Sequence, residues 1–266
     1  MIETRDLTLG YDGNSVVQDI NTKFESGKLT LILGLNGSGK STLLKTLMGI
    51  LKPIDGSVLI DGENLENLSI QQRAKKMSAI MQSQQVPSMS VFQYVLHGRF
   101  HDLSWPRRYR KKDRLLTLKA LKAMGIEELA DCRMDEISGG QRQKASLAQA
   151  LCQDGDIVFL DEPAAYLDAA SQFDLYKKAK NLAHKQKKTV IMISHDLPAA
   201  LENADEVRIL HQGKLYFSGT PEEFIQADIS SEVFGLEIIE EMIQGKKRYL
   251  YLPGENQNQF AGHNEN

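Results

Sequence analysis

The chain has 266 residues, of which 41% are hydrophobic and 25% charged, and its formal net charge is −3. This length and composition are typical of a folded protein with a substantial core. The small negative charge provides no global basic field for nucleic acid, and no apolar run approaches the roughly 20 residues that span a bilayer.

The first third of the chain is predicted to alternate strands with turns and short helices. Residues 2–9 and 16–24 favour two strands around a turn at 10–14, and residues 28–50 favour a strand, a glycine-rich loop and a helix. The further elements predicted here are a short strand at 56–60, a helix at 70–76 and a strand at 77–81.

The middle of the chain changes character. Residues 90–153 contain helix-like segments near 90–98, 111–124 and 139–152 and no convincing strand. In the segment 111–124 four apolar residues recur at near-helical spacing, namely Leu115, Leu118, Leu121 and Met124.

Strand patterns return at 156–160 and 189–194, with a helical stretch at 171–187 between them. This alternation predicts a parallel sheet with crossover helices. Two strand-like runs, 205–211 and 214–219, flank Gly213 and predict a hairpin.

The end of the chain is less regular. A short helix is predicted at 221–226, and mixed signals follow up to residue 254. Residues 255–266 are rich in Asn, Gln and Glu and are predicted to be disordered.

The segment Gly34–Ser41 fits G-x-x-x-x-G-K-[ST], the phosphate-binding P-loop, and it lies between a strand and a helix as that motif requires. Its backbone N–H groups and the helix N-terminus are expected to bind phosphate, with Lys40 reaching the β- and γ-phosphates and Ser41 holding Mg²⁺. The nucleotide-binding residues predicted here are Gly34, Asn36, Gly37, Ser38, Gly39, Lys40, Ser41 and Thr42. The motif alone leaves kinases, GTPases and ATPases open.

Two adjacent carboxylates, Asp161 and Glu162, end the buried-strand pattern that begins at Ile157. Neighbouring side chains of a strand point to opposite faces, so the two can do different work. At the carboxyl edge of a parallel sheet beside a P-loop, Asp161 can hold Mg²⁺ and Glu162 can orient or deprotonate the attacking water.

The segment Ser138-Gly-Gly-Gln141 opens a predicted helix. Ser138 followed three residues later by Gln141 is a capping box, which is the purely structural interpretation of this segment. Because Gly139 and Gly140 cost helix stability, capping alone does not explain them, and their N–H groups are open to an anion.

With these residues the chain resembles the ATP-binding cassette (ABC) proteins. Ile137-Ser-Gly-Gly-Gln-Arg-Gln143 is similar to the family signature and stands at the family's distance before Asp161-Glu162. The remaining family elements follow in order over residues 2–220: Tyr11 as the aromatic A-loop residue that stacks on adenine, Gln82 as the Q-loop, Ala165–Asp168 as the D-loop and His195 as the switch histidine.

The resemblance implies an α/β fold: a P-loop NTPase (RecA-like) core with an N-terminal antiparallel β subdomain and an inserted α-helical ABC subdomain. The expected boundaries are an ABC ATPase domain over 1–254, with the core at 1–87 and 156–220, the helical signature subdomain at 88–155, a C-terminal extension at 221–254 and the tail at 255–266.

The resemblance also implies an ATPase whose cofactors are ATP and Mg²⁺. It assigns catalysis to Glu162, His195, Gln82 and Lys40, and Mg²⁺ to Ser41, Gln82 and Asp161. Tyr11 joins the P-loop in holding the nucleotide. Ser138, Gly139, Gly140 and Gln141 are expected to contact the ATP bound by a second copy in a head-to-tail homodimer.

Two departures from the family pattern are visible. Ile137 replaces the usual leucine, and Ala164-Ala165-Tyr166 replaces the commoner Thr-Ser-Ala before the D-loop aspartate. The bulky Tyr166 is expected to alter communication between the two sites of a dimer, while neither change removes a catalytic group.

A single cassette needs separate partners for transport. The resemblance implies an integral membrane permease, an extracytoplasmic binding protein acting through it, no nucleic acid, and a peripheral position on the cytoplasmic face of the cell membrane. The segment Ser90–Arg99 and the end of the cassette, Gly219–Glu223, resemble importers of iron–siderophore, haem and cobalamin. An exporter or extractor subunit and a soluble cofactor-assembly ATPase remain the alternatives.

A basic run, Arg107–Lys112, follows Trp105. A solvated helix face is the favoured interpretation, and proximity to a membrane partner or to anionic headgroups is the alternative. His97 and His101 are four residues apart, but with no nearby ligand carboxylate other than Asp102 they are not assigned a metal site.

Overall fold

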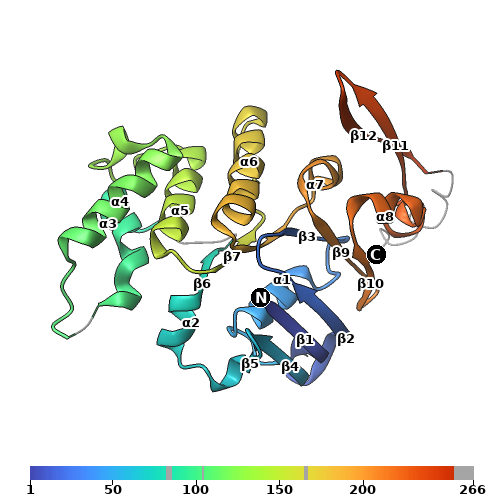
Figure 1. Cartoon of the computed structure of the whole chain (residues 1–266), viewed down its shortest axis with the longest axis horizontal. Coiled ribbons are helices and arrows are strands. Elements are labelled where there is room, and N and C mark those ends of the chain that lie inside the picture. Colours follow the sequence, from blue (N-terminus) through green and yellow to red (C-terminus); the bar gives the residue numbers. More distant parts are fainter. Residues whose placement is uncertain (82–85, 104, 165–166, 255–266) are drawn as a thin grey trace, which may run out of the picture.

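The computed structural model describes residues 1–81, 86–103, 105–164 and 167–254 of the chain (Figure 1). Gln82, the D-loop residues Ala165 and Tyr166, and the predicted disordered tail at 255–266 therefore lie outside the described residues. No helix in the described part is long and apolar enough to cross a membrane.

A ten-stranded sheet runs through the molecule in the order β5-β4-β1-β2-β10-β9-β3-β8-β7-β6. One half is parallel and consists of β3 (Leu29–Leu33), β6 (Met77–Ile80), β7 (Ile157–Asp161), β8 (Thr189–Ile193) and β9 (Glu206–His211). The other half consists of β1 (Ile2–Tyr11), β2 (Asn14–Phe24), β4 (Asp55–Ile60) and β5 (Glu63–Asn64), which pair antiparallel, while β10 (Lys214–Gly219) joins the two halves. The predicted α/β fold is confirmed.

The parallel strands are continuous buried runs because helices cover them. All five residues of β3 are buried, and they alternate between two hydrophobic clusters. Leu29, Leu31 and Leu33 belong to the cluster that also contains residues of the helical stretch between β6 and β7. Ile32 belongs to the cluster that also contains α1 (Lys40–Leu47) and the antiparallel strands. This period of two puts one side of the sheet against each layer.

Helices lead from one parallel strand to the next, as the alternation predicts. Helix α6 (Ala169–Gln186) joins β7 to β8, α7 (Leu197–Asn203) joins β8 to β9, and α2 (Ile70–Lys76) leads into β6. The helix predicted at 171–187 begins two residues earlier, because Asp168 caps it by accepting a hydrogen bond from the backbone N–H of Ser171 at 2.8 Å.

The segment between β6 and β7 forms a helical lobe at the left of Figure 1. It contains α3 (Val91–Leu96), the 3₁₀ helix η2 (His97–Asp102), α4 (Lys111–Met124) and α5 (Gly139–Gln153), which confirms the three helices predicted there. A buried ion pair ties the lobe together, because Arg99 donates to Asp113 of α4 and to the carbonyls of Cys152 and Gln153 in α5.

The C-terminal part contains a hairpin that the mixed sequence signals did not reveal. After α8 (Pro221–Gln226) and α9 (Ser230–Phe234), β11 (Leu236–Ile243) and β12 (Lys246–Pro253) pair antiparallel and project from the molecule (Figure 1). Gln244 and Gly245 make the turn, both with positive φ. Glutamine is not a preferred residue at such a position, so the turn carried little sequence signal.

Candidate functional site

Many of the predicted site residues, but not those of the signature, converge on one edge of the parallel sheet. The register pairs Asp161 at the end of β7 with Ile193 at the end of β8, and Ile193 with Ile32 in β3. The loops that follow β3, β7 and β8 therefore leave the sheet side by side. In open α/β sheets this carboxyl edge is where ligands bind.

The loop Gly34–Ser41 is packed tightly against two strands. A Cβ on Gly34 would lie 2.3 Å from the carbonyl oxygen of Leu210 in β9, and a Cβ on Gly39 would lie 2.3 Å from Cγ2 of Val17 in β2. Gly39 also has a φ of 97°, in the region that favours glycine. Asn36 and Gly37 are exposed at the tip of the loop, whereas Ser38 is half-buried and its hydroxyl has no partner among the described residues.

Lys40 begins α1 and is 5% exposed. Its ammonium donates to the carbonyl oxygens of Gly34 and Leu35, both at 2.9 Å, so it lies along the inside of the loop. Burial lowers the pKa of Lys40, and the nearby Glu162 and Asp161 carboxylates oppose that change. The buried cation therefore faces two carboxylates across the sheet edge.

Asp161 is 3% exposed, and its Oδ1 atom makes no hydrogen bond within the described part of the chain. Burial raises the pKa of this carboxyl, and the charge of Glu162 raises it further. A buried acceptor oxygen without a donor fits a hard cation such as Mg²⁺, which prefers oxygen ligands. Ser41, half-buried in the first turn of α1, supplies a second oxygen, whereas Gln82 lies outside the described residues.

Glu162 and His195 make the closest polar contact at this edge. Nε2 of His195 lies 2.5 Å from Oε1 of Glu162, although the residues are 33 positions apart in the chain. The carboxylate is largely buried and the imidazole half-exposed, so the pair has one side toward solvent. Glu162 has a φ of 48°, a sparsely populated conformation for a residue with a side chain, and such outliers cluster at functional sites.

Tyr11 and Thr42 connect the antiparallel half of the sheet to the loop. The Tyr11 hydroxyl lies 3.4 Å from Oγ1 of Thr42, while 44% of the tyrosine remains exposed. An exposed aromatic ring beside the P-loop can stack on a base. The structure thus brings Tyr11 to the same edge as Lys40, Asp161, Glu162 and His195.

The signature residues lie elsewhere, at the N-terminus of α5. Ser138 and Gln141 form the predicted capping box, in which Ser138 Oγ accepts from the Gln141 N–H at 3.2 Å and Gln141 Oε1 accepts from the Ser138 N–H at 2.9 Å. Ser138 and Gly139 are exposed and Gly140 is half-buried. Helix α5 packs on α3, α4 and β6, whereas α1 packs on β1 and β7, so the signature belongs to a different layer from the P-loop.

One supporting contact was not predicted. The hydroxyl of Tyr176 in α6 lies 2.7 Å from the Ser194 hydroxyl, which in turn accepts from the Asp196 N–H, so the residues on both sides of His195 are held. Burial raises the pKa of Tyr176 to about 12, so this phenol stays protonated and shares a hydrogen bond with the Ser194 hydroxyl. No motif marks this tyrosine, and only the packing of α6 against β8 brings it there.

A polar and aromatic groove lies between α2 and η2, beside the C-terminal half of α5. It has a volume of about 780 Å³. Three apolar residues along it are unusually exposed: Ile70 at 85%, Phe100 at 51% and Trp105 at 90%. Isolated apolar residues on a surface are ordinary, but three around one groove make it a candidate interaction surface. Apolar Ile70 at the start of polar α2 was the available sequence signal.

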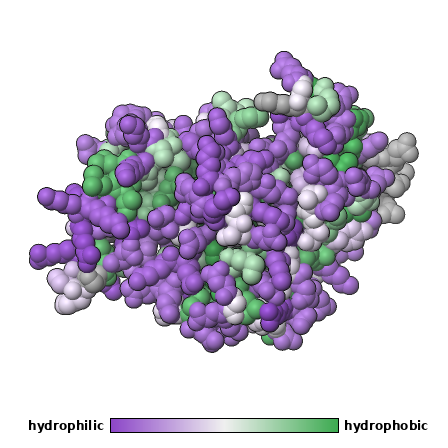
Figure 2. All heavy atoms as spheres, viewed as in Figure 1, coloured by the Kyte–Doolittle hydropathy of each residue, from purple (hydrophilic) through white to green (hydrophobic). Residues whose placement is uncertain are grey.

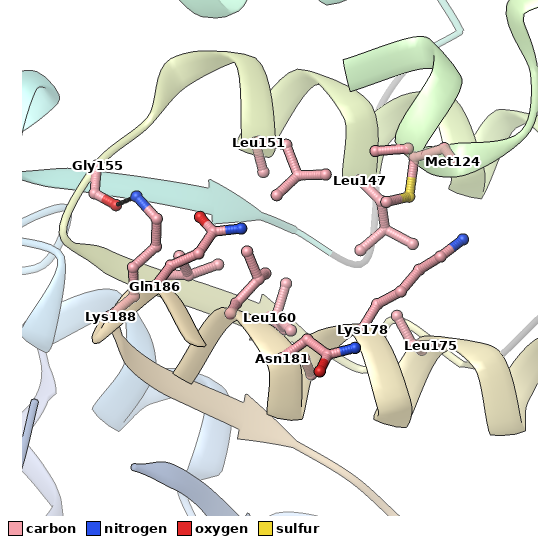
Figure 3. A pocket seen from close by; sticks show the side chains of 15 residues that line it. Met124, Leu147, Leu151, Gly155, Leu160, Leu175, Lys178, Asn181, Gln186 and Lys188 are labelled. Carbon is pink, nitrogen blue, oxygen red and sulfur yellow. Dashed lines mark hydrogen bonds between the residues drawn. The ribbon is translucent and has the colours of Figure 1, made fainter. Parts of the chain in front are cut away.

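A second, smaller cavity of about 130 Å³ lies between α5, β7 and α6 (Figure 3). Leu147, Leu151, Leu160 and Leu175 line it, and Lys188 at one end donates to the carbonyl oxygen of Gly155 at 2.8 Å. The cavity therefore lies where the helical lobe meets β7 and α6. Among the described residues no group of three His, Cys, Asp or Glu side chains could hold a metal ion.

Comparison with known proteins gives matches to one protein family. The ABC transporter family model matches residues 17–165. The chain is 35% identical over 237 residues to the petrobactin import ATP-binding protein FpuD of Bacillus anthracis, covering 89% of this chain and 87% of that one. It is 35% identical over 242 residues to the ferric enterobactin transport ATP-binding protein FepC of Escherichia coli (strain K12), covering 90% and 89%.

Solved structures give the same fold. The inward-facing conformation of a metal-chelate type ABC transporter superposes with a TM-score of 0.82 at 24% identity, covering 95% of this chain and 96% of that one. A dimeric bacterial ABC transporter cassette superposes with a TM-score of 0.75 at 24% identity, covering 83% and 99%.

Proposed function

The chain belongs to the ABC transporter family as an ATP-binding subunit, an ATPase, and on that basis we propose that it drives import of an iron chelate through a separate permease. Of the substrate classes that its sequence favours, relatives named for petrobactin and enterobactin support an iron–siderophore over haem or cobalamin.

The contact between Glu162 and His195 carries the proposed chemistry. Glu162 acts as the base that orients or deprotonates the attacking water, and His195 positions that carboxylate and contacts the γ-phosphate. The 2.5 Å contact supports these roles, because it aligns the two groups beside the P-loop. Lys40 and the loop N–H groups hold the phosphates, and Tyr11 stacks on the adenine.

Asp161 and Ser41 are the residues proposed to hold Mg²⁺, together with Gln82. The partnerless Oδ1 atom of Asp161 supports this assignment. When bound, Mg²⁺ neutralises charge on the β- and γ-phosphates. The chain's own contribution is to keep Asp161 buried at the end of β7, where its carboxylate would hold the cation, while Glu162 follows directly after the strand.

The active assembly is proposed to be a head-to-tail homodimer. Ser138 and Gly140 at the N-terminus of α5 contact the ATP held by the P-loop of the second copy. Their exposure in a layer separate from their own P-loop supports this arrangement, as does the dimeric state of a structurally similar cassette. ATP then bridges the two copies, and its hydrolysis removes the shared ligand and lets them separate.

The groove between α2 and η2 is the surface proposed to receive the permease on the cytoplasmic face of the membrane. It is close in sequence to Gln82, to which the family resemblance assigns the link between the γ-phosphate site and the helical lobe, and the exposed Ile70 and Phe100 offer apolar contacts. The substrate-binding protein acts through the permease from the other side of the membrane.

The test is a trapped complex. Glu162→Gln removes the base and retains the P-loop, so we expect ATP binding to persist while turnover falls about 10²- to 10⁴-fold. The tagged variant is expressed in its native cell, trapped with Mg-ATP and purified in detergent. We expect it to co-purify with a polytopic permease. Exposed Glu136→Gln is the matched control and should turn over normally.

Two outcomes would contradict the proposal. Rapid hydrolysis by Glu162→Gln would remove the assignment of the base. Co-purification of a soluble partner without any membrane protein would replace the import function by that of a soluble ATPase and leave the ATP chemistry intact.

A further inference from the structure

The charge of the chain is distributed very unevenly along it. Residues 103–126 contain eight of the 32 lysines and arginines and only one of the 35 aspartates and glutamates. The whole chain carries a net charge of −3, so this basic segment stands out against an acidic background. Clusters of this kind are attracted to anionic partners.

The single acidic residue of this segment points inward. Asp113 is 5% exposed, accepts from the Arg110 N–H at 2.8 Å and pairs with the buried guanidinium of Arg99 at 3.4 Å. Its charge is therefore neutralised inside the helical lobe. The outer surface of α4 carries cations without a compensating carboxylate of its own.

The outer face of α4 combines these cations with exposed leucines. Lys111, Leu115, Leu118 and Lys122 are spaced by four, three and four residues, so they form one stripe, and Lys119 flanks it. Leu115 is 59% exposed and Leu118 48% exposed. Within the described residues these three lysines make no salt bridge. Figure 2 shows apolar atoms over this lobe beside projecting hydrophilic side chains.

The loop before α4 extends the same pattern. Trp105 is 90% exposed, Arg107 lies 4.8 Å from the centre of the Phe100 ring, and Arg108 is exposed. Tryptophan beside arginine is the combination found at membrane–water interfaces, where the indole sits at headgroup level. Trp105 and Arg107 line the groove proposed for the permease, and on that proposal this loop faces the membrane.

We propose that this basic face, made of the Trp105–Arg108 loop and the outer stripe of α4, binds the anionic phospholipid surface directly. The lysines contact phosphate-bearing headgroups, and Trp105, Leu115 and Leu118 enter the boundary between headgroups and acyl chains. This contact goes beyond the permease interaction. It orients the cassette on the membrane before and during transport.

The exposed leucines distinguish this occupant from others. A solvated helix face would present polar residues at positions 115 and 118, and a nucleic-acid site would need cations alone along the phosphate backbone. A bilayer accepts both groups, because lysine side chains extend their charge to the headgroups while neighbouring apolar side chains sink below them.

Trp105 makes the test direct, because it is the only tryptophan of the chain. The full-length protein is mixed with vesicles of phosphatidylcholine alone or with added phosphatidylglycerol. We expect co-sedimentation and a blue shift of tryptophan emission only with the anionic vesicles, weakened by salt. Brominated lipids should quench the emission if the indole reaches the acyl boundary.

Substitutions then distinguish binding by this face from an effect of the net charge of the protein. Replacing Lys111, Lys119 and Lys122 by Gln should weaken partitioning about a hundredfold, because each lysine near an anionic surface contributes about 1 kcal/mol. The matched control replaces Lys177, Lys185 and Lys214 by Gln, three exposed lysines on other elements, and should bind as the wild type does. ATP turnover in solution should be unchanged in both variants. Turnover therefore checks that each variant is folded, and it tests the ATPase assignment independently of membrane binding.

Three outcomes would overturn the proposal. Equal binding to both vesicle types, or equal loss in the control variant, would show that the basic face has no specific role. Tighter binding to single- or double-stranded nucleic acid than to anionic vesicles would assign the face to that polymer. Binding only to vesicles that contain the permease would assign it to a protein contact.

Discussion

At the scale of single residues, Asp161 illustrates how a functional group costs stability. Its folded-state pKa is raised by burial, so the stability it contributes is present below its ordinary pKa and is lost as the pH rises through the folded value. At neutral pH its ionised form therefore destabilises the nucleotide-free protein. A cation placed on its partnerless oxygen would reverse that penalty.

Replacement of Asp161 by Asn tests this balance. We expect a higher melting temperature without nucleotide at neutral pH, because the amide carries no charge to bury, and a smaller gain in melting temperature when Mg-ATP is added. The gain over wild type should vanish below the ordinary pKa of aspartate. Differential scanning fluorimetry across pH measures both, and a variant that is less stable at neutral pH would refute the argument.

Tyr176 is a residue that acts only through another. Tyr176→Phe removes the hydroxyl beside Ser194, and a buried hydroxyl that loses its partner costs about 1–3 kcal/mol. We expect urea unfolding at lower denaturant and a reduced kcat with unchanged KM for ATP, since His195 is held less firmly. Tyr94→Phe, which loses a similar hydroxyl contact with Ser146 in the helical lobe, should reduce stability alone.

At the scale of elements, the helical lobe depends on Arg99. Its guanidinium joins η2 to Asp113 of α4 and to two carbonyls of α5. Arg99→Met leaves the buried Asp113 carboxylate without its cation, for which the expected loss is about 3–5 kcal/mol of unfolding free energy. The double variant with Asp113→Asn should recover part of that loss. Chemical denaturation measures both, and a single variant as stable as the wild type would contradict this role.

Sequence reasoning reached the elements whose signals are local. Gly34–Ser41, Asp161–Glu162 and His195 each follow a strand pattern, and parallel strands bring such ends to one edge, so their convergence could be anticipated. The insertion of β8 between β3 and β7 is a non-local pairing with no local signal. The hairpin β11–β12 was not predicted, because apolar and polar residues do not alternate cleanly in Leu-Glu-Ile-Ile-Glu-Glu and Gln244 occupies the turn.

At the scale of the whole molecule, substitutions can distinguish the function of the groove from that of the catalytic edge. Ile70→Asp places a charge on the groove, so we expect normal ATP turnover in solution and loss of permease association and uptake. Ile50→Asp is the matched control, because Ile50 is 65% exposed and does not line the groove. Pull-down of the permease and uptake in cells measure the difference, and equal effects of both variants would remove the groove from the interface.

The cavity between α5 and the core sheet has a consequence of a different kind. Its walls belong to two layers, so any rotation of the helical lobe against β7 and α6 changes the volume of the void. Hydrostatic pressure favours whichever state encloses less empty space. Compression should therefore shift the balance between conformations of the cassette, and the sign of its effect on ATP turnover reports whether α5 moves toward the core or away from it.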